Sequence, residues 1–468
     1  MPELPEVETV KKVITPIVIN RRILSIDVLR KTIIQNEPKE DFVNSLIGET
    51  FLSISRIGKF LIFHLSHDKV MISHLRMEGK YFDVLEKEEN SKYARVVFHL
   101  DNGHKLCYDD SRTFGILKLT TEQDYLKEKE IAQLGPEPFK ADAKEIYKQV
   151  KKSSLPIKST LLDQTLMTGL GNIYVDEVLF ASKIHPLTPA KDITLKEWEV
   201  IIANAIRILN NAIEEGGSTI RSYHPGKGID GNFQTALKAY GKGGEKCPDC
   251  GHYFRFIKVG GRGTTFCPNC QPRRGGPLSI AIYGRSGSGK SEVLKAFKDR
   301  GYATISSDDI VHVLYKKPEV ISLINKTFNQ GFAGEIDRDV FRNYLKDNPK
   351  MVNKLNRLIH PLVKKEVERF LKEEKSSLLV VEVPLLFEAK MENMFDILLA
   401  VDVNEKTQLA RLKERNPSSA IDIKQINSYS KFDEYKEKAD VVINNNADLI
   451  KLNKEIDKLI NKWQSRLN

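Results

Sequence analysis

The most informative stretch of the chain is Leu278-Ser279-Ile280-Ala281-Ile282-Tyr283-Gly284-Arg285-Ser286-Gly287-Ser288-Gly289-Lys290-Ser291. Its first six residues form an apolar run typical of a buried strand, and its last eight match the G-x4-G-K-S phosphate loop. In such a loop the backbone N–H groups surround phosphates, the lysine (Lys290) neutralises phosphate charge and the serine (Ser291) coordinates Mg²⁺. The stretch therefore predicts a site for a nucleotide with Mg²⁺, formed by residues 284–291.

The sequence after this loop predicts a small doubly wound domain. Apolar strand-like runs recur at 377–383 and 397–403, with helical patterns between them. Helicase and motor ATPases also use phosphate loops, but residues 278–468 are too few for such an engine. A kinase on a parallel α/β sheet is the better interpretation.

Several motifs in this half together resemble the dephospho-coenzyme A kinases. They are Asp308 after a strand, His360-Pro361, Val383-Pro384-Leu385-Leu386-Phe387-Glu388, Arg411 with Arg415, and Ala439-Asp440-Val441-Val442-Ile443-Asn444. The resemblance implies ATP-dependent phosphorylation of the ribose 3′-hydroxyl of dephospho-CoA. Asp308 would accept the hydroxyl proton, and Arg411 and Arg415, four residues apart on one helix face, would close on the triphosphate.

The kinase resemblance has departures in the acceptor and lid regions. The family's Asp-Ala-Asp stands here as Ser306-Ser307-Asp308, and His312 takes the place of an arginine. Gln425 and Tyr429 replace the family's arginine and glutamine ahead of Ala439. A P-loop ATPase, or a kinase of another acceptor, therefore stays an alternative for this half.

At the other end, the chain begins Met1-Pro2-Glu3-Leu4-Pro5-Glu6-Val7-Glu8-Thr9. Removal of Met1 would leave Pro2 as a secondary amine, and a terminal amino group has a pKa of about 8, roughly two units below lysine. Pro2 would then be a nucleophile that is partly neutral at physiological pH, with Glu3 beside it as acid or base. An ordinary terminus with two prolines is the competing interpretation of this stretch alone.

The residues after this opening stretch predict a β-sandwich or barrel followed by helices. Short apolar runs such as 51–54, 60–63 and 94–98 alternate with turn residues between about 17 and 117. The charged stretch 121–153 is interpreted as a linker, and a long amphipathic helix is expected at 195–215. At Thr168-Gly169-Leu170-Gly171-Asn172 two glycines lead into a helix start, a setting that suits phosphate, so Asn172 is a candidate phosphate contact.

Four cysteines near the middle of the chain have the spacing of a metal site. Cys247 and Cys250 form one pair, and Cys267 and Cys270 the other. In a cytosolic chain this spacing favours one structural zinc over two disulfides, because four thiolates leave no open position for water. Within 227–274, nine Lys and Arg stand against three Asp and Glu, which is typical of a surface that binds DNA. Cys107 is expected to be a buried thiol without a role.

Together these motifs resemble the formamidopyrimidine-DNA glycosylases, from residue 1 to about 271. The resemblance implies excision of 8-oxoguanine or formamidopyrimidine from double-stranded DNA, with Pro2 forming an imine at the sugar C1′ and elimination cutting the strand. It also implies that the glycine-rich segment from Ser218 to Gly231 closes over the flipped base. The sister endonuclease VIII group, which acts on oxidised pyrimidines, remains an alternative.

The resemblance places further residues around the DNA. Lys59 and Arg262 are implied to hold phosphate at the catalytic site, and Glu6 is our candidate for recognising the lesion. The residues Met77, Arg112 and Phe114 match the family's intercalating set. An enzyme that flips a base from a duplex needs such wedges to fill the gap and to hold the orphaned partner.

We therefore expect a multidomain protein. Its predicted parts are a β-sandwich catalytic domain at 1–120, a helix-two-turn-helix DNA-binding part at 121–240, a zinc finger at 241–271, a linker at 272–277 and a P-loop kinase domain at 278–468. A net charge of +10 agrees with an anionic partner. No apolar run is long enough to span a membrane, so a cytoplasmic monomer is expected.

Overall fold

The protein is described by a computed structural model that covers residues 2–217, 233–348, 350–415, 427 and 431–467. The described chain divides into two compact units, residues 1–243 with 258–266, and residues 244–257 with 267–468. No described helix is long and apolar enough to cross a membrane. Residues 218–231, Gln425 and Tyr429, which were singled out above, lie outside the described residues.

The first unit begins with a helix that the sequence analysis did not anticipate, α1 (Leu4–Val18). Glu3 and Glu6 form a capping box at its start, and Pro5 lies in its first turn, where a missing N–H costs nothing. The apolar residues Val7, Val10, Ile14 and Val18 recur at helical spacing and are buried in the core of the β-sandwich.

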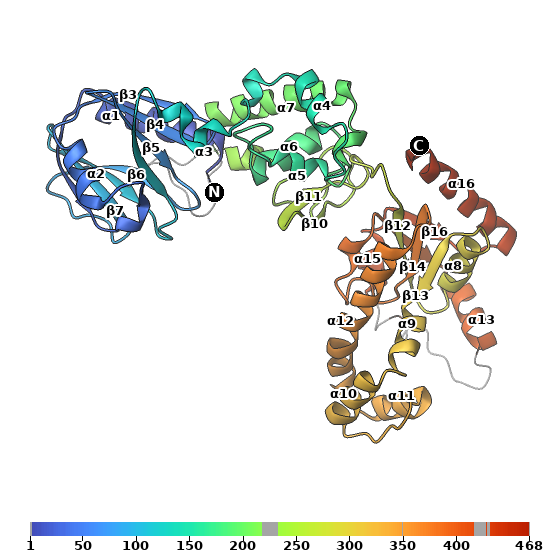
Figure 1. The fold of residues 1–468 in the computed structure, drawn as a ribbon. Coiled ribbons are helices and arrows are strands. Elements are labelled where there is room, and N and C mark those ends of the chain that lie inside the picture. The colour runs from blue at the N-terminus through green and yellow to red at the C-terminus, as the bar shows by residue number, and fades with distance from the viewer. Residues whose placement is uncertain (1, 218–232, 349, 416–426, 428–430, 468) are drawn as a thin grey trace. The chain divides into compact units, whose positions relative to one another are not determined.

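The sandwich itself confirms the predicted β-rich region. One sheet has the strand order β1-β7-β8-β6 and the other β2-β9-β5-β4-β3, and their inner faces share one apolar core with α1 (Figure 1). The strands are β1 (Ile23–Val28), β2 (Ile34–Gln35), β3 (Phe51–Ile57), β4 (Phe60–Leu65), β5 (Lys69–His74), β6 (Lys80–Leu85), β7 (Ala94–Leu100), β8 (His104–Asp109) and β9 (Ile116–Thr121), with α2 (Lys39–Leu46) beside them.

A helical part follows within the same unit. Its helices are α3 (Lys129–Ala132), α4 (Ala143–Val150), α5 (Ile157–Leu161), α6 (Asn172–Ala181) and α7 (Leu195–Glu214). Helix α7 confirms the predicted amphipathic helix. Helix α4 lies in the stretch 121–153 that was interpreted as a linker, so that interpretation was wrong for this helix. Asp142 caps the helix, and Ile146 and Val150, four residues apart, are buried in the helical core.

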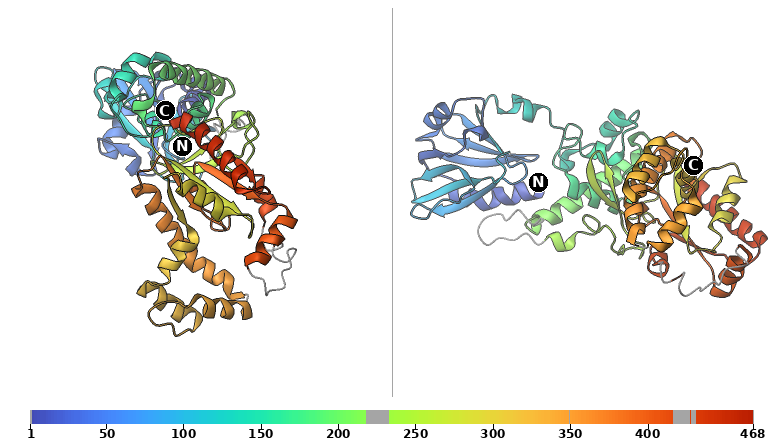
Figure 2. Two further views of the ribbon diagram at one scale, coloured as in Figure 1. Left: turned by 90° about the vertical axis from the view of Figure 1, so that its right-hand side faces the viewer. Right: turned by 90° about the horizontal axis from the view of Figure 1, so that it is seen from below.

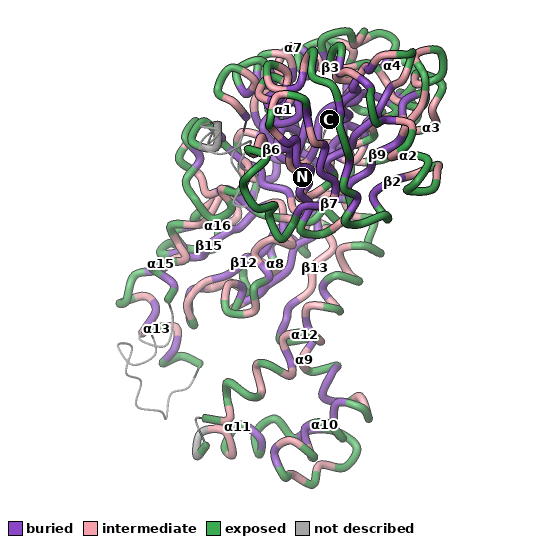
Figure 3. The backbone as a smooth tube through the Cα atoms, turned by 90° about the vertical axis from the view of Figure 1, so that its left-hand side faces the viewer, coloured by how far each residue is buried: buried purple, intermediate pink, exposed green. Residues whose placement is uncertain are grey.

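The second unit contains the parallel sheet that the phosphate loop predicts. Its strand order is β13-β14-β12-β15-β16, and the four pairings are parallel. The strands are β12 (Leu278–Gly284), β13 (Ala303–Ser306), β14 (Leu378–Glu382), β15 (Ile397–Asp402) and β16 (Val441–Asn444), and Figure 3 marks β12 and β15 as largely buried.

Helices cover both faces of this sheet (Figure 1). Alternate residues of β12 point to opposite faces: Ile280 and Ile282 belong to the core shared with α8 and α16, whereas Ala281 and Tyr283 belong to the core shared with α9 and α12. The helices are α8 (Lys290–Lys298), α9 (Ser307–Leu314), α10 (Pro318–Phe328), α11 (Arg338–Asp347), α12 (Lys350–Glu373), α13 (Glu405–Arg415), α15 (Phe432–Lys436) and α16 (Leu449–Leu467). Helices α10 and α11 stand away from the sheet (Figure 2).

The cysteine-bearing segment 244–257 is grouped with the second unit. It contains the start of β10 (Arg255–Val259), which pairs with β11 (Arg262–Phe266) in the hairpin expected between the cysteine pairs. Arg255 is buried, and its guanidinium donates to the carbonyl of Phe395 and to the carboxylate of Asp440. These contacts tie the start of the hairpin to the strand ends of β15 and β16.

Candidate functional sites

The N-terminal residues meet the start of helix α6 inside the first unit. Pro2 and Glu3 are both buried. The Glu3 carboxylate accepts backbone hydrogen bonds from Gly171 at 2.6 Å and Ile173 at 2.9 Å. Because the first N–H groups of a helix have no partner within it, the positive end of α6 is occupied by a carboxylate that lies 168 residues before Gly171 in the sequence.

The charge of Glu3 is finely balanced. Burial raises the pKa of its carboxyl to about 7, although the Lys59 ammonium and the N–H groups of Ile173 and Gly171 act in the opposite direction. A carboxyl with a pKa near neutrality both accepts and releases a proton at physiological pH, which is what an acid-base group next to an amine nucleophile requires.

Lys59 lies in the turn between β3 and β4, and only 5% of it is exposed. Its ammonium donates to the carbonyl of Leu170 at 2.7 Å, on the same loop that supplies Gly171. Burial lowers the pKa of Lys59, while Glu3 and Glu6 oppose that change. Lys59 therefore adds a positive charge to the Glu3 site and is joined directly to the loop before α6.

Glu6 is almost completely buried and has partners on both oxygens. One oxygen accepts the N–H of Glu3 at 2.9 Å, and the other accepts the hydroxyl of Tyr174 at 2.6 Å. A Cβ at Gly217 would lie 3.2 Å from the Glu6 carboxylate. Glu6 thus connects α1 to α6 and faces the residue that precedes the glycine-rich segment 218–231.

Glu137, which the sequence analysis did not select, fixes the turn that carries Lys59. Its carboxylate accepts a hydrogen bond from the N–H of Gly58 at 2.8 Å and pairs with Arg56 at 2.6 Å. The signal was present, because Gly135-Pro136-Glu137-Pro138 places a carboxylate between two prolines in an otherwise charged stretch. We interpreted that stretch only as a break in the chain.

The three predicted wedge residues lie on two loops at one end of the sandwich strands. Met77 lies between β5 and β6, and Arg112 and Phe114 lie between β8 and β9. Arg112 and Phe114 are exposed, and the guanidinium carbon of Arg112 lies 4.7 Å from the centre of the Phe114 ring.

A buried aspartate shapes the loop of Arg112 and Phe114. Asp110 has no exposed surface, and its carboxylate accepts the N–H groups of Arg112, Phe114 and Gly115 at 2.9, 2.8 and 2.7 Å. This carboxylate satisfies the backbone of a tight loop, so the two wedge side chains are left to point outward. Sequence reasoning selected the wedge residues and missed the residue that presents them.

A buried ion pair sets the position of the loop that carries Arg262. Lys158 and Asp176 pair at 2.6 Å, with side-chain exposures of 0% and 1%. The Lys158 ammonium also donates to the carbonyl of Gly263 at 2.9 Å, and the Asn172 amide donates to the same carbonyl at 3.0 Å. The structure therefore brings the predicted phosphate contacts Asn172 and Arg262 together, because Asn172 bonds to Gly263, the residue that follows Arg262.

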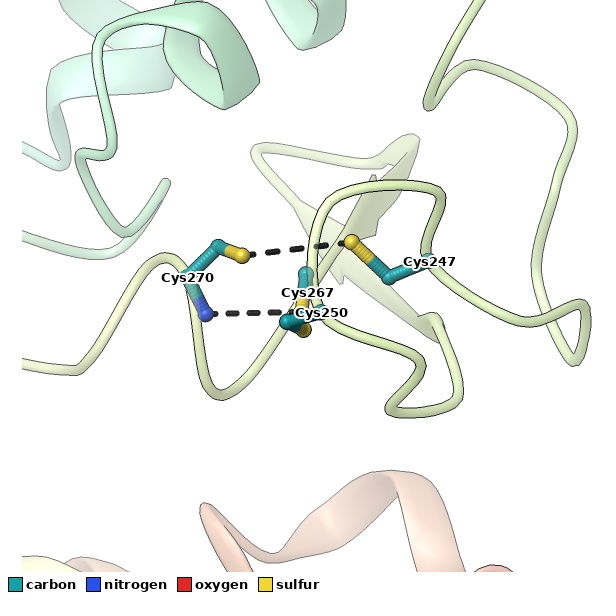
Figure 4. Close-up of side chains that lie close together, drawn as sticks. All are labelled: Cys247, Cys250, Cys267 and Cys270. Atoms are coloured by element: carbon teal, nitrogen blue, oxygen red, sulfur yellow. Dashed lines mark hydrogen bonds between the residues drawn. The ribbon is translucent and has the colours of Figure 1, made fainter.

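The four predicted zinc ligands converge in the second unit (Figure 4). The sulfurs of Cys247, Cys250, Cys267 and Cys270 lie within 4.8 Å of one another. Tetrahedral zinc with bonds of about 2.3 Å places its sulfur ligands about 3.8 Å apart, so these four thiolates fit one ion. Cys107 is buried on β8, away from this cluster, and burial raises the pKa of its thiol to about 11.

The phosphate loop lines a cavity of about 560 Å³ in the second unit. The predicted groups Lys290, Ser291, Asp308 and Arg415 all face this cavity, together with residues of α12. Burial lowers the pKa of Lys290, opposed by Glu382 and Asp308. The cavity thus gathers the loop, the proposed base and one predicted lid arginine.

The loop conformation depends on its glycines and on two further side chains. Gly289 has a φ of +90°, and a Cβ there would lie 2.2 Å from the amide nitrogen of Asn445. Asn445 donates to the carbonyl of Ser288 at 2.9 Å, and Arg411 donates to the same carbonyl at 3.3 Å. Arg411 therefore contacts the phosphate loop itself, whereas Asn445 was not selected from the sequence.

The structure describes two of the residues that depart from the kinase family pattern, Ser306 and His312. Ser306, at the position of a family aspartate, caps α9, because its hydroxyl accepts the N–H of Asp308 at 3.1 Å. His312 does not line the nucleotide cavity; it faces a separate cavity of about 240 Å³ between the end of α9 and the start of α11.

Comparison with known proteins assigns each part of the chain to a family. Residues 1–117 match the model of the formamidopyrimidine-DNA glycosylase N-terminal domain, and residues 134–224 match the H2TH domain of the same enzymes. Residues 244–273 match a zinc finger found in FPG and IleRS, and residues 278–451 match the dephospho-CoA kinase model.

Relatives and solved structures agree for the first part. The formamidopyrimidine-DNA glycosylases of Mycoplasma mobile and Ligilactobacillus salivarius are 42% and 46% identical, and each aligns over 58% of this chain and 99% of its own length. A Lactococcus lactis FPG mutant in complex with Fapy-dG DNA has a TM-score of 0.56 and 40% identity, and aligns over 58% of this chain and 100% of its own. A complex of the Lactococcus lactis enzyme with abasic-site DNA scores 0.55 at 39% identity, with the same coverage.

Proposed function

Because this chain belongs to the formamidopyrimidine-DNA glycosylase family and carries a dephospho-CoA kinase domain behind that part, we propose that it is a bifunctional enzyme. Its first activity excises oxidised purines from double-stranded DNA and cuts the strand. Its second activity transfers the γ-phosphate of ATP to the 3′-hydroxyl of dephospho-CoA. The observation that supports the first activity best is the buried Glu3 carboxyl next to Pro2, held by the N-terminus of α6.

In the glycosylase reaction, the Pro2 amine that is free after removal of Met1 attacks C1′ of the damaged nucleoside. The bond from C1′ to the base breaks as the new C–N bond forms, the base leaves with a proton, and the Pro2 nitrogen loses its own proton. The C1′–O4′ bond of the sugar then breaks as O4′ takes up a proton, which leaves a protonated imine between Pro2 and C1′. Glu3 moves these protons, because its pKa of about 7 allows both protonation states. Elimination from the imine then breaks the strand on both sides of the sugar.

The DNA contacts follow from the geometry around α6. Lys59, Asn172 and Arg262 hold phosphates beside the lesion, since all three border the loop or hairpin next to the start of α6. The exposed pair Arg112 and Phe114, together with Met77, fills the gap left by the flipped base. Glu6 is our candidate for contact with the damaged base, because it faces Gly217 at the entrance to the glycine-rich segment.

Borohydride trapping tests the glycosylase. We expect the protein to become covalently attached to duplex DNA with 8-oxoguanine, and Pro2→Gly to lose attachment. An intact protein that never traps, although it binds the duplex, would contradict the imine. Excision of 8-oxoguanine compared with thymine glycol separates this assignment from the endonuclease VIII alternative.

The kinase reaction takes place in the cavity of the phosphate loop. Bound Mg²⁺ would neutralise part of the triphosphate charge, and Ser291 is positioned to contribute to its binding. Lys290 and the loop N–H groups hold the β- and γ-phosphates, and Arg411 and Arg415 approach them from α13. Asp308, exposed at the start of α9, takes the proton of the 3′-hydroxyl as that oxygen attacks.

Transfer of labelled phosphate from ATP to dephospho-CoA tests this activity, with Asp308→Asn as the variant that removes the base. We expect transfer by the full-length protein and its loss in the variant, with ATP binding retained. ATP binding without transfer in the unmodified protein would indicate another acceptor. We further propose a monomer acting in the cytoplasm, where DNA and ATP are available, and sedimentation velocity with and without DNA tests the monomer.

A further inference from the structure

The side chain of Arg285, the second residue of the phosphate loop, has no role in the mechanism above. Arg285 lines the nucleotide cavity. Its guanidinium donates to both carboxylate oxygens of Asp433 in α15, and its central carbon lies 5.2 Å from the centre of the Phe432 ring. The loop therefore carries a second cation, besides Lys290, whose charge is paired with a carboxylate of a neighbouring helix.

The two partners of this ion pair differ in their exposure to solvent. The Arg285 side chain is 14% exposed, whereas the Asp433 side chain is 75% exposed. Water and salt screen an exposed carboxylate, so Asp433 holds the arginine only weakly. The Phe432 ring, by contrast, is buried in the core beside the sheet and gives the guanidinium a fixed surface to lie on. Arg285 is thus kept at the cavity by a partner that it can leave at low cost.

Other side chains hold the shape of the phosphate loop. The amide of Gln408 on α13 donates to the carbonyl of Ser286 at 2.8 Å, and the amide of Asn445 donates to the carbonyl of Ser288 at 2.9 Å. Both amide side chains are buried, so these hydrogen bonds are protected from water. The loop therefore does not depend on the ion pair of Arg285 for its conformation.

The triphosphate of ATP is a stronger partner for Arg285 than Asp433 is. It brings several negative charges into the loop, and a guanidinium binds phosphate through two parallel hydrogen bonds. The attraction between opposite charges is also stronger in a partly desolvated cavity than at an exposed carboxylate. Because Arg285 belongs to the loop that surrounds the phosphates, its side chain alone has to turn for the partners to be exchanged.

We propose that Arg285 is a phosphate-binding residue of the kinase domain and that Asp433 competes with ATP for its guanidinium. This inference rests on the proposed kinase function and adds to it one ATP contact and one internal competitor. When ATP binds, the guanidinium leaves Asp433 and pairs with the triphosphate. Asp433 therefore lowers the affinity for ATP, although it is not among the residues that line the cavity.

The competing role for this ion pair is that of a latch that holds α15 against the phosphate loop. A latch supports the ATP site, so the loss of either partner would weaken ATP binding. Competition predicts opposite effects, because the loss of Arg285 removes a phosphate contact whereas the loss of the Asp433 charge releases Arg285 for the phosphates. The direction of the change in Asp433→Asn therefore separates the two roles.

The experiment titrates the full-length protein with ATP in excess Mg²⁺ by calorimetry. Asp433→Asn should tighten ATP binding about two- to five-fold, the range that corresponds to the loss of an exposed ion pair. Arg285→Ala should weaken ATP binding about ten-fold or more, since hydrogen bonds between charged groups are lost. Asp433 is exposed, so its variant should keep the melting temperature of the unmodified protein.

Glu434→Gln is the matched control. Glu434 is the next residue of α15, is 60% exposed and lies 3.9 Å from Lys438 in an ion pair of its own. Its removal takes away the same charge from the same helix and should leave ATP affinity unchanged. The double variant Arg285→Ala with Asp433→Asn should bind ATP as Arg285→Ala does, because Asp433 acts through Arg285.

Each other outcome contradicts the competition. Weaker or unchanged ATP binding by Asp433→Asn would overturn it, and weaker binding would identify a latch. Equal tightening by Glu434→Gln, or tightening by Asp433→Asn that persists without Arg285, would also overturn it, since the acids of α15 would then repel ATP directly. In these cases phosphate transfer to dephospho-CoA by the unmodified protein would leave the kinase assignment standing. Failure of the unmodified protein to bind ATP would overturn both this inference and the proposed kinase.

Discussion

The carboxylate of Glu3 accepts a hydrogen bond from the N–H of Gly171 over 2.6 Å, across 168 residues of sequence. This contact needs glycine, because a Cβ at position 171 would lie 2.4 Å from the Glu3 carboxyl carbon. Gly171→Ala should therefore push Glu3 away from Pro2 and reduce borohydride trapping at least ten-fold, about 1.4 kcal/mol in the barrier. Gly331→Ala is the control, since nothing lies within 4 Å of a Cβ there; equal trapping by both variants would contradict the role of the contact.

The pKa of Glu3 predicts how stability depends on pH. Its value of about 7, against 4.5 for the unperturbed group, means that folding disfavours the ionised form. Protonated Glu3 makes its full contribution to the free energy of unfolding below pH 4.5, and this contribution is lost as the pH rises to 7. Relative to Glu3→Gln, the unmodified protein should lose roughly 3 kcal/mol of unfolding free energy across this window.

Fluorescence of Trp198 measures this change locally. Trp198 is buried in the helical core of the first unit, and the other tryptophan, Trp463, is removed by Trp463→Phe. Urea unfolding at several pH values in that background follows the first unit alone. A difference between the unmodified protein and Glu3→Gln that stays constant from pH 4.5 to 7 would show that the carboxyl has an ordinary pKa.

The main role of the Lys158 and Asp176 pair should be to position Arg262, and its net contribution to stability should be small. Loss of one partner leaves a buried charge, so Lys158→Met should cost roughly 3–5 kcal/mol. The double variant Lys158→Met with Asp176→Leu should recover most of that stability, since apolar residues often replace a buried pair without loss. The double variant should not recover DNA affinity, because the carbonyl of Gly263, next to Arg262, no longer accepts a hydrogen bond from Lys158. Full recovery of DNA affinity would mean that the pair does not position Arg262.

The sequence predicted the broad architecture and the chemical groups well, because these depend on local patterns. Alternating strands, the amphipathic run at Leu195–Glu214, the phosphate loop and the cysteine spacing are each readable from a short window. Helix α1 was missed because the prolines and acids of the opening stretch drew attention to chemistry, although Glu3 and Glu6 form a capping box.

The residues that hold the sites were missed for a different reason. Asp110, Glu137 and Lys158 act through backbone groups that are distant or unremarkable in sequence, so no motif marks them. The roles of the motif residues could be inferred from their spacing in the sequence. The residues that position them could be identified only in the folded structure.

Zinc removal should separate the two activities. The hairpin that carries Arg262 lies between the two cysteine pairs, so a variant without zinc should lose DNA binding. ATP affinity should persist, because no residue of 244–273 lines the nucleotide cavity. Cys250→Ser should lower bound zinc from one ion per chain, measured by atomic absorption, whereas Cys107→Ser should keep it. Loss of ATP affinity together with zinc would indicate that the start of the hairpin, through Arg255, supports the sheet.

The exposed ring of Phe114 provides the clearest test of base flipping. Phe114 is 53% exposed and belongs to no core cluster among the described residues, so Phe114→Ala should leave the melting temperature unchanged. Its stacking in a duplex is worth about 1–3 kcal/mol, which predicts a loss of about 5- to 150-fold in excision of 8-oxoguanine from duplex DNA. Leu126, which is 55% exposed, is the matched control, and Leu126→Ala should keep full activity. If Phe114→Ala excises as fast as the unmodified protein, the flipped base leaves no gap that this ring fills, and Met77 and Arg112 would have to stabilise the opened duplex alone.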